Sequence, residues 1–193
     1  MEIIYRHFDS LPSTNDWAKT HLENLSREAL TVITAVTQTQ GRGRYGKRWI
    51  SPPGENLYAT FVFFASTQDP AQITHLLALS ALQLLQEKGI TTQIKWPNDL
   101  LVNRKKIAGI LCETVGNQGI VIGIGLNVNM SLESLGLIDQ PATSILCETG
   151  AVQEIPTLIS CLAERFSTDL MLYLEQGFTP FASRFQAHLI RPF

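Results

Sequence analysis

The chain is organised around the stretch QTQGRGRYGKRWISPPGENLY, which runs from Gln38 to Tyr58. Its first half carries four cations between Arg42 and Arg48, three glycines among them, and no aliphatic residue before Trp49. Such a segment cannot pack a hydrophobic core, and its glycines increase the entropy lost on ordering. At roughly 1–2 kcal/mol per residue, fixing residues Gly41–Arg48 costs on the order of 10 kcal/mol. We therefore predict a loop that is loose when empty and closes over a phosphate or carboxylate. A solvated basic loop that binds nucleic acid is the alternative, and this segment alone does not decide between them.

Length and composition narrow the class of protein. The 193 residues, 45% of them hydrophobic, predict one globular domain over residues 1–193. A net charge of −2 argues against a general nucleic-acid binder, because the positive charge is local. Three scattered cysteines and no signal peptide predict reduced thiols in a cytoplasmic protein. No apolar run reaches the ~18 residues of a membrane span, so we expect no membrane contact.

Strands flank the glycine–arginine stretch. The β-branched run Thr31–Thr37 precedes it and Leu57–Phe64 follows it, which predicts an antiparallel pair with a long loop. Ser13-Thr14-Asn15-Asp16 precedes apolar residues at helical spacing, which is typical of a helix N-terminus. A simple helix cap and a site for a carbonyl or anion are both open readings of those residues.

The remaining segments complete an α+β pattern. Asp69-Pro70 begins a helix that Gly89 ends, and Pro156 begins the longest helix, which stops before Gly177. The sequence predicts a mixed, largely antiparallel sheet with helices packed on one side. The other predicted segments are strands at Met1–Phe8, Thr92–Lys95, Leu100–Val102, Ile107–Val115 and Ile120–Leu126, turns at Asn103–Lys105 and Gly116–Gly119, and helices at Ala142–Cys147 and after Thr179-Pro180.

Three segments at strand ends are expected to meet at one place: the loop, Lys95 before its Trp-Pro turn, and Gly125–Asn129. Guanidinium groups such as Arg42 and Arg44 bind carboxylate or phosphate through paired hydrogen bonds. The ammonium of Lys95 can neutralise charge on a phosphoryl oxygen, unless it is simply a surface lysine.

Two further residue types fit a nucleotide. Trp49 offers an aromatic face to a base, and Asp99 could help to hold Mg²⁺ with phosphates, or serve only as a turn former. The loop lacks the spacing of a Walker loop and the strand–helix context of a Rossmann fingerprint. No Ser-His-Asp or Cys-His arrangement is visible.

Four blocks of the sequence together resemble a known family. GRGRYGKRWISPPGENLY, KWPNDLL, KKIAGILCE and VIGIGLNVN are similar, in content and order, to the signature blocks of biotin protein ligases. The resemblance covers the chain from Ser13 to Arg191-Pro192. It implies an enzyme that converts biotin and MgATP into biotinyl-5′-adenylate and then biotinylates a lysine of a biotin carboxyl carrier protein.

The resemblance also implies site residues. One cation that some relatives carry in the loop is replaced here by Tyr45. By this resemblance biotin contacts Ser13, Thr14, Asn15, Gln38, Arg42, Gly43, Arg44 and Lys95, ATP contacts Arg44, Lys47, Trp49, Lys95 and Asn127, and the catalytic cations are Lys95, Arg42 and Arg44. Asp99 is the metal candidate on its residue type alone.

Two departures and two alternatives accompany the resemblance. Relatives that act as repressors carry a preceding DNA-binding domain, and others a following SH3-like domain. Because the signature begins at Ser13 and the chain ends after Arg191-Pro192, we expect neither, no DNA partner, and weaker use of ATP and carrier. A homodimer stays open. The alternatives are a lipoate or octanoate ligase of the same fold, and a biotin-binding module that has lost catalysis.

Overall fold

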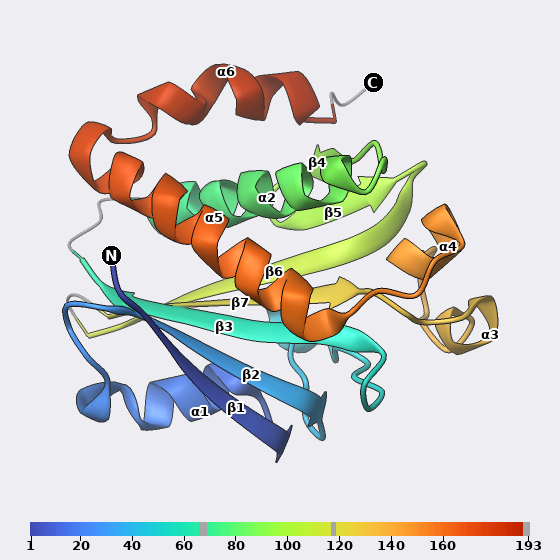
Figure 1. Cartoon of the computed structure of the whole chain (residues 1–193), viewed down its shortest axis with the longest axis horizontal. Helices are drawn as coiled ribbons and strands as arrows, with labels where there is room; N and C mark the ends of the chain where they lie inside the picture. Colours follow the sequence, from blue (N-terminus) through green and yellow to red (C-terminus); the bar gives the residue numbers. More distant parts are fainter. Residues whose placement is uncertain (66–68, 117–118, 191–193) are drawn as a thin grey trace.

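The computed structural model of the chain describes residues 1–65, 69–116 and 119–190 (Figure 1). The centre of the predicted turn at Gly116–Gly119 and the Arg191-Pro192 end lie outside these residues. Seven strands form one sheet in the order β1-β2-β3-β7-β6-β5-β4. Only β1 and β2 are parallel among its paired strands, so the prediction of a mixed, largely antiparallel sheet is confirmed. The strands are β1 (Ile3–Leu11), β2 (Leu30–Gln38), β3 (Asn56–Phe64), β4 (Gln93–Lys95), β5 (Asp99–Val102), β6 (Lys105–Val115) and β7 (Gly119–Asn127).

The helices begin and end at the local signals that the sequence carries. Ser13 accepts a hydrogen bond from the backbone N–H of Asp16 and caps α1. Asp69 caps α2 ahead of Pro70, and Gly177 ends α5 with a positive φ. The helices are α1 (Thr14–Thr20), α2 (Pro70–Glu87), α3 (Leu132–Leu135), α4 (Ile145–Thr149), α5 (Ile155–Gln176) and α6 (Thr179–His188), with single 3₁₀ turns at Leu22–Asn24 and Arg44–Gly46.

Two short helices differ from the prediction. Helix α4 begins three residues later than expected, because Ala142 pairs with Lys106 of β6 and Ser144 provides the cap. Helix α3 was not predicted, since its four residues are too few for an apolar period to appear. No helix in the described ranges is long and apolar enough to cross a membrane.

Helices cover both faces of the sheet, and unequally. The long helices α2, α5 and α6 pack on one face over the main core, as predicted. Helix α1 lies on the opposite face, which corrects the prediction that all helices share one side (Figure 1). Its Ala18 is fully buried in a second, smaller core with Ile33 and Val121. The apolar stripe of α1 packs on this second face of the sheet. It covers only part of that face, and the sheet area beside α1 is open for a site.

The side chains of β7 alternate between the two faces. Ile120, Ile122, Ile124 and Leu126 belong to the core under the long helices. The intervening positions face α1 and include Gly123 and Gly125. The register places Gly123 between Thr60 of β3 and Leu111 of β6, and Gly125 between Tyr58 and Gly109. The glycines therefore create a low area in the sheet surface beside α1.

Candidate active site

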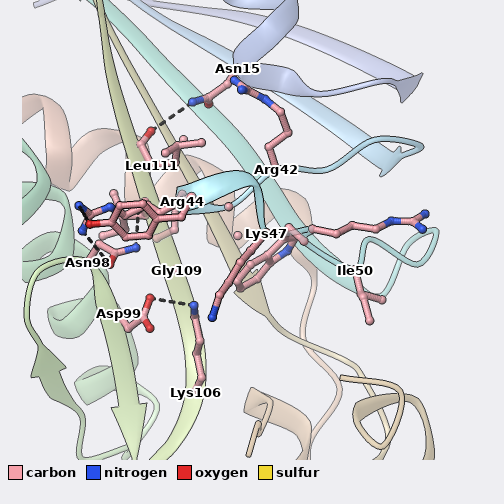
Figure 2. A pocket seen from close by; sticks show the side chains of 18 of the residues that line it. Asn15, Arg42, Arg44, Lys47, Ile50, Asn98, Asp99, Lys106, Gly109 and Leu111 are labelled. Atoms are coloured by element: carbon pink, nitrogen blue, oxygen red, sulfur yellow. Dashed lines mark hydrogen bonds and ion pairs between the residues drawn. The ribbon is translucent and has the colours of Figure 1, made fainter. Parts of the chain in front are cut away.

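A cavity of about 620 Å³ lies on this open area of the sheet. It is bordered by the N-terminus of α1, the glycine–arginine loop, the turn between β4 and β5, and the glycines of β6 and β7 (Figure 2). The three segments predicted to meet do so in part: the loop and Lys95 both line the cavity, together with Gly125. Of the predicted site residues, only Asn127 is absent from the cavity wall; the others are Ser13, Thr14, Asn15, Gln38, Arg42, Gly43, Arg44, Lys47, Trp49, Lys95 and Asp99.

One end of the cavity is a buried network of neutral polar groups. The backbone N–H of Thr14 donates to Gln38 Oε1 at 2.9 Å. The hydroxyl oxygens of Thr14 and Thr60 are 2.8 Å apart, and Thr60 Oγ lies 2.7 Å from Asn15 Oδ1. Each hydroxyl has one proton, so Thr60 donates to Asn15 and Thr14 donates to Thr60, while Thr14 Oγ1 also lies 3.1 Å from Gln38 Oε1. The network fixes the side chains of Thr14 and Asn15, and Gln38, which lines the cavity, also donates from Nε2 to Ser51 Oγ at 3.2 Å.

Charged groups continue this network toward the loop. Asn15 Nδ2 donates to Glu113 Oε2 at 2.9 Å, and Arg42 Nη2 reaches both Glu113 oxygens at 2.9 and 3.0 Å. Asp16 lies 2.8 Å from the same Arg42 nitrogen. Burial alone would raise the pKa of the Glu113 carboxyl, but bonds from Lys19, Asn15 and Arg42 outweigh it and lower that pKa. Arg42 is thus paired with two carboxylates of the protein. The sequence predicted it as a ligand for an anionic substrate and did not predict these ion pairs.

The loop itself forms a narrow hairpin. Trp49 N–H donates to the Gly41 carbonyl at 2.9 Å, and Gly43 N–H donates to the Lys47 carbonyl at 2.7 Å. At its tip Tyr45 has φ +57° and is 88% exposed. The Arg44 guanidinium lies 5.0 Å from the centre of the Tyr45 ring and reaches Asn98 Oδ1 at 3.4 Å (Figure 2). The tip therefore touches the β4–β5 turn where the Arg44 guanidinium meets the neutral amide of Asn98.

Trp49 covers the glycines on the floor of the cavity. A Cβ on Gly109 would lie 2.9 Å from Trp49 Cζ3, and a Cβ on Gly125 would overlap the indole. Lys106 Nζ lies 5.3 Å from the centre of the ring. The buried Nε1 of Trp49 has no hydrogen-bond partner in the part of the chain that the structure describes. The ring thus brings an aromatic face and an unused donor to the cavity.

Asp99, the metal candidate, is paired with a cation. Its carboxylate lies 2.8 Å from Lys106 Nζ (Figure 2). Within the described ranges no group of three or more His, Cys, Asp or Glu side chains is placed to hold a metal. At this point the cavity presents the Asp99–Lys106 ion pair instead of a free carboxylate.

Asn127 borders a second, smaller cavity of about 50 Å³ beside the first, which Trp49 and Lys106 also line. Its Nδ2 donates to the Thr143 carbonyl at 2.9 Å. Its buried Oδ1 has no hydrogen-bond partner among the described residues. An unused acceptor and the unused donor of Trp49 thus border the same small space.

Sequence reasoning missed three parts of the site. Lys106 lines both cavities, Glu113 pairs with Arg42, and Leu137–Gln140 adds a wall. Lys106 and Glu113 both fall in the KKIAGILCE block, so the block itself was the available signal. The backbone of Lys106 also holds the Leu137–Gln140 segment near the cavity, because it makes hydrogen bonds with Pro141 and Thr143, which directly follow that segment.

Comparisons with known proteins show the family of the chain. The Biotin/lipoate A/B protein ligase family matches residues 7–129. The bifunctional ligase/repressor BirA of Bacillus subtilis is 32% identical over 197 residues, 93% of this chain. The biotin–[acetyl-CoA-carboxylase] ligase of Paracoccus denitrificans is 32% identical over 171 residues, covering 82% of this chain and 70% of that protein.

A solved structure has the same fold. The biotin protein ligase of Aquifex aeolicus, in complex with biotin and ATP, superposes with a TM-score of 0.80 at 29% identity. The match covers 98% of this chain and 78% of that one. The chain spans only 58% of the length of the Bacillus subtilis protein.

Proposed function

We propose that this chain, which belongs to the biotin/lipoate A/B protein ligase family, is an ATP-dependent biotin ligase. It activates biotin as biotinyl-5′-AMP and transfers the biotinyl group to a lysine of a biotin carboxyl carrier protein. The observation that carries the proposal is the division of one cavity into a neutral polar end at Thr14 and Gln38 and a cationic end at Arg44 and Lys95.

That division suits the two ends of biotin. The ureido ring has two N–H donors and one carbonyl acceptor, which the Gln38 amide and Ser13 hydroxyl can pair. The valerate carboxylate then points to the cations. A dithiolane ring has no comparable donors, so lipoate would leave the remaining hydrogen-bonding capacity of Gln38 and Ser13 unused. The geometry therefore favours biotin over the lipoate and octanoate alternative.

The cations serve the first step. A biotin carboxylate oxygen attacks the α-phosphorus of ATP, and the bond from that phosphorus to the pyrophosphate oxygen breaks. Negative charge gathers on the α-phosphate and the leaving group. Lys95 and Arg44 both line the cavity, neither is in an ion pair with a described residue, and both can stabilise this charge. This argues against a module that only binds biotin.

The second step needs no side-chain nucleophile from this chain. The amine of the carrier lysine attacks the biotinyl carbonyl, the bond to the phosphate oxygen breaks, and AMP leaves. The new amide loses its extra proton. The chain contributes by keeping the mixed anhydride from water until the lysine arrives, which is the role we give to the hairpin loop.

Trp49 and Asn127 are the residues that we assign to the adenine. The indole gives a stacking face, and Asn127 Oδ1, which has no partner among the described residues, suits an exocyclic amine. Because the cavity offers an Asp99–Lys106 ion pair, we treat Mg²⁺ as part of the MgATP substrate, bound chiefly by phosphates.

The wider setting follows from charge and chemistry. A net charge of −2, with the basic residues gathered at the loop, supports a carrier protein and small molecules as partners, and no DNA. The unpaired cysteines Cys112, Cys147 and Cys161 support a cytoplasmic location.

Biotin-dependent exchange between ATP and labelled pyrophosphate tests the proposal. We expect exchange with biotin and none above background with lipoate or octanoate. Exchange with lipoate alone would assign the chain to the rival substrate. Biotin binding without exchange would assign it to the binding-only alternative.

A further inference from the structure

We propose that Glu113 is a positioning residue: together with Asp16 it holds Arg42 and Asn15, and thereby fixes the base of the loop beside the biotin end of the cavity. This inference rests on the proposed function for its ligand, and on geometry alone for the anchoring. It changes the role of Arg42 from anion ligand to anchor.

The first step is the closed ring of charges. Arg42 contacts Glu113 and Asp16, and Lys19 contacts the same two carboxylates at 2.8 and 2.9 Å. Two cations and two carboxylates alternate, so the formal charge of the ring is zero. An incoming anion would therefore gain little from Arg42, because its charge is already compensated.

The second step is the contrast with the tip of the loop. Arg44 contacts only neutral groups among the described residues, namely Asn98 and Tyr45. Lys47 has no ion pair within the described ranges, which extend over the whole loop. The loop thus has a base whose charge is compensated and a tip whose charge is available to a ligand. Only the tip of the loop has cations that are available to bind a phosphate.

The third step joins the ring to the biotin end. Glu113 accepts from Asn15, Asn15 accepts from Thr60, and Thr60 contacts Thr14, which donates its N–H to Gln38. Asn15 Nδ2 also donates to the Leu111 carbonyl, and its side chain fills the space above Gly123. Movement of Glu113 would therefore be transmitted through side chains in direct contact.

Partial burial gives the ring its strength. The side chains of Glu113 and Lys19 are 24% and 27% exposed, less than those of Arg42 and Asp16. Hydrogen bonds to charged groups that are partly withdrawn from water are stronger than those of surface pairs. Glu113→Gln keeps the shape but leaves two cations facing the single carboxylate of Asp16.

The anchoring is tested by proteolysis that does not depend on activity. Trypsin must take the Arg42 side chain into its own pocket to cut the Arg42–Gly43 bond. Fragments identified by mass should show slow cutting at Arg42 relative to Arg44 in the original chain. Glu113→Gln should raise the ratio of the cutting rate at Arg42 to that at Arg44 about 10-fold, which is the effect of losing one good charged contact. An unchanged ratio would overturn the anchoring.

The positioning is tested by calorimetric titration with biotin alone. Glu113→Gln should weaken biotin binding about 10-fold with little change in melting temperature. In an Arg42→Gln background the same change should add little, since the partner is gone. Full additivity, or a lower melting temperature with unchanged biotin affinity, would make Glu113 merely structural and overturn the inference.

A matched control is Glu87→Gln, which breaks the pair with Arg165 on the far side of the sheet. Glu87→Gln should change neither the ratio of tryptic cutting at Arg42 to Arg44 nor the affinity for biotin. If the original chain binds no biotin, the proposed function fails, and the ratio of tryptic fragments still decides the anchoring separately.

Discussion

The indole of Trp49 occupies the space that a side chain at Gly125 would need. Two residues further back along β7, the Asn15 side chain occupies the corresponding space above Gly123. Neighbouring glycines on one strand therefore support different parts of the site: Gly125 the aromatic wall, and Gly123 the polar end.

Substitution of these glycines should separate ATP from biotin. Gly125→Ala should displace Trp49 and raise the KM for ATP about 10-fold, because overpacking typically costs about 1–3 kcal/mol. Gly123→Ala should displace Asn15 and weaken biotin binding by a similar factor. Titration with biotin and exchange kinetics at varied ATP measure both. Each variant is the control for the other, and equal effects on both ligands would contradict the division.

Lys95 should matter for chemistry far more than for folding. Its side chain is exposed at the end of β4, where a surface substitution changes stability by about 0.5 kcal/mol or less. Removing a cation that stabilises transition-state charge costs roughly 10²- to 10³-fold in rate. Lys95→Ala should thus lose most pyrophosphate exchange at an unchanged melting temperature. Lys88→Ala, at the exposed end of α2, is the control. Near-normal exchange in Lys95→Ala would remove Lys95 from the mechanism.

The tip of the loop should become protected when ligands bind. Arg44, Lys47 and Arg48 lie in a segment with few buried contacts, so trypsin should cut there in the empty protein. Biotin together with ATP should slow this cutting, because the bound adenylate offsets the ordering entropy. Equal digestion with and without ligands would show that the loop does not close.

Loss of the Arg44 side chain should release the adenylate. Arg44→Gly removes the guanidinium that reaches the β4–β5 turn across the cavity. We expect more free biotinyl-5′-AMP and indiscriminate biotinylation of lysines on a bystander protein. The measurement is the ratio of bystander to carrier labelling. A ratio equal to that of the original chain would exclude Arg44 from the closing segment.

The stability of the fold should decrease as the pH is lowered, because His75 becomes protonated. Its ring stacks on Phe185 of α6 with ring centres 4.2 Å apart, and burial lowers its pKa despite nearby Asp69. The unfolded chain then binds the proton more readily than the folded chain, so the stability lost grows as pH drops below about 6.5. His75→Phe keeps a ring without the titration.

Thermal unfolding at pH 7.5, 6.5 and 5.5 checks this expectation. The original chain should lose more melting temperature between pH 6.5 and 5.5 than the His75→Phe variant. Parallel losses in the two proteins would assign the pH dependence to other groups.

Local signals in the sequence determined most of the fold. The β-branched run at Thr31–Thr37 is strand β2, and Pro70 and Gly89 bracket helix α2 closely. The glycine–arginine stretch and Lys95 were predicted to share one site, and they do. These features depend on residues that are close in the sequence, namely helix caps, turn residues and the spacing of apolar side chains.

Only the tertiary structure decided which residues face one another in the site. Arg42 and Glu113 are 71 positions apart, and they pair because the loop that follows β2 reaches β6, which β3 and β7 separate from β2 in the sheet. Asn127 was expected beside the main cavity, but its side chain is turned to Thr143 and a smaller one. The side of the sheet that α1 covers was equally invisible, since an apolar stripe fits either face. Helix caps and strand runs act over a few residues, whereas the register of distant strands is set by the packing of the whole sheet.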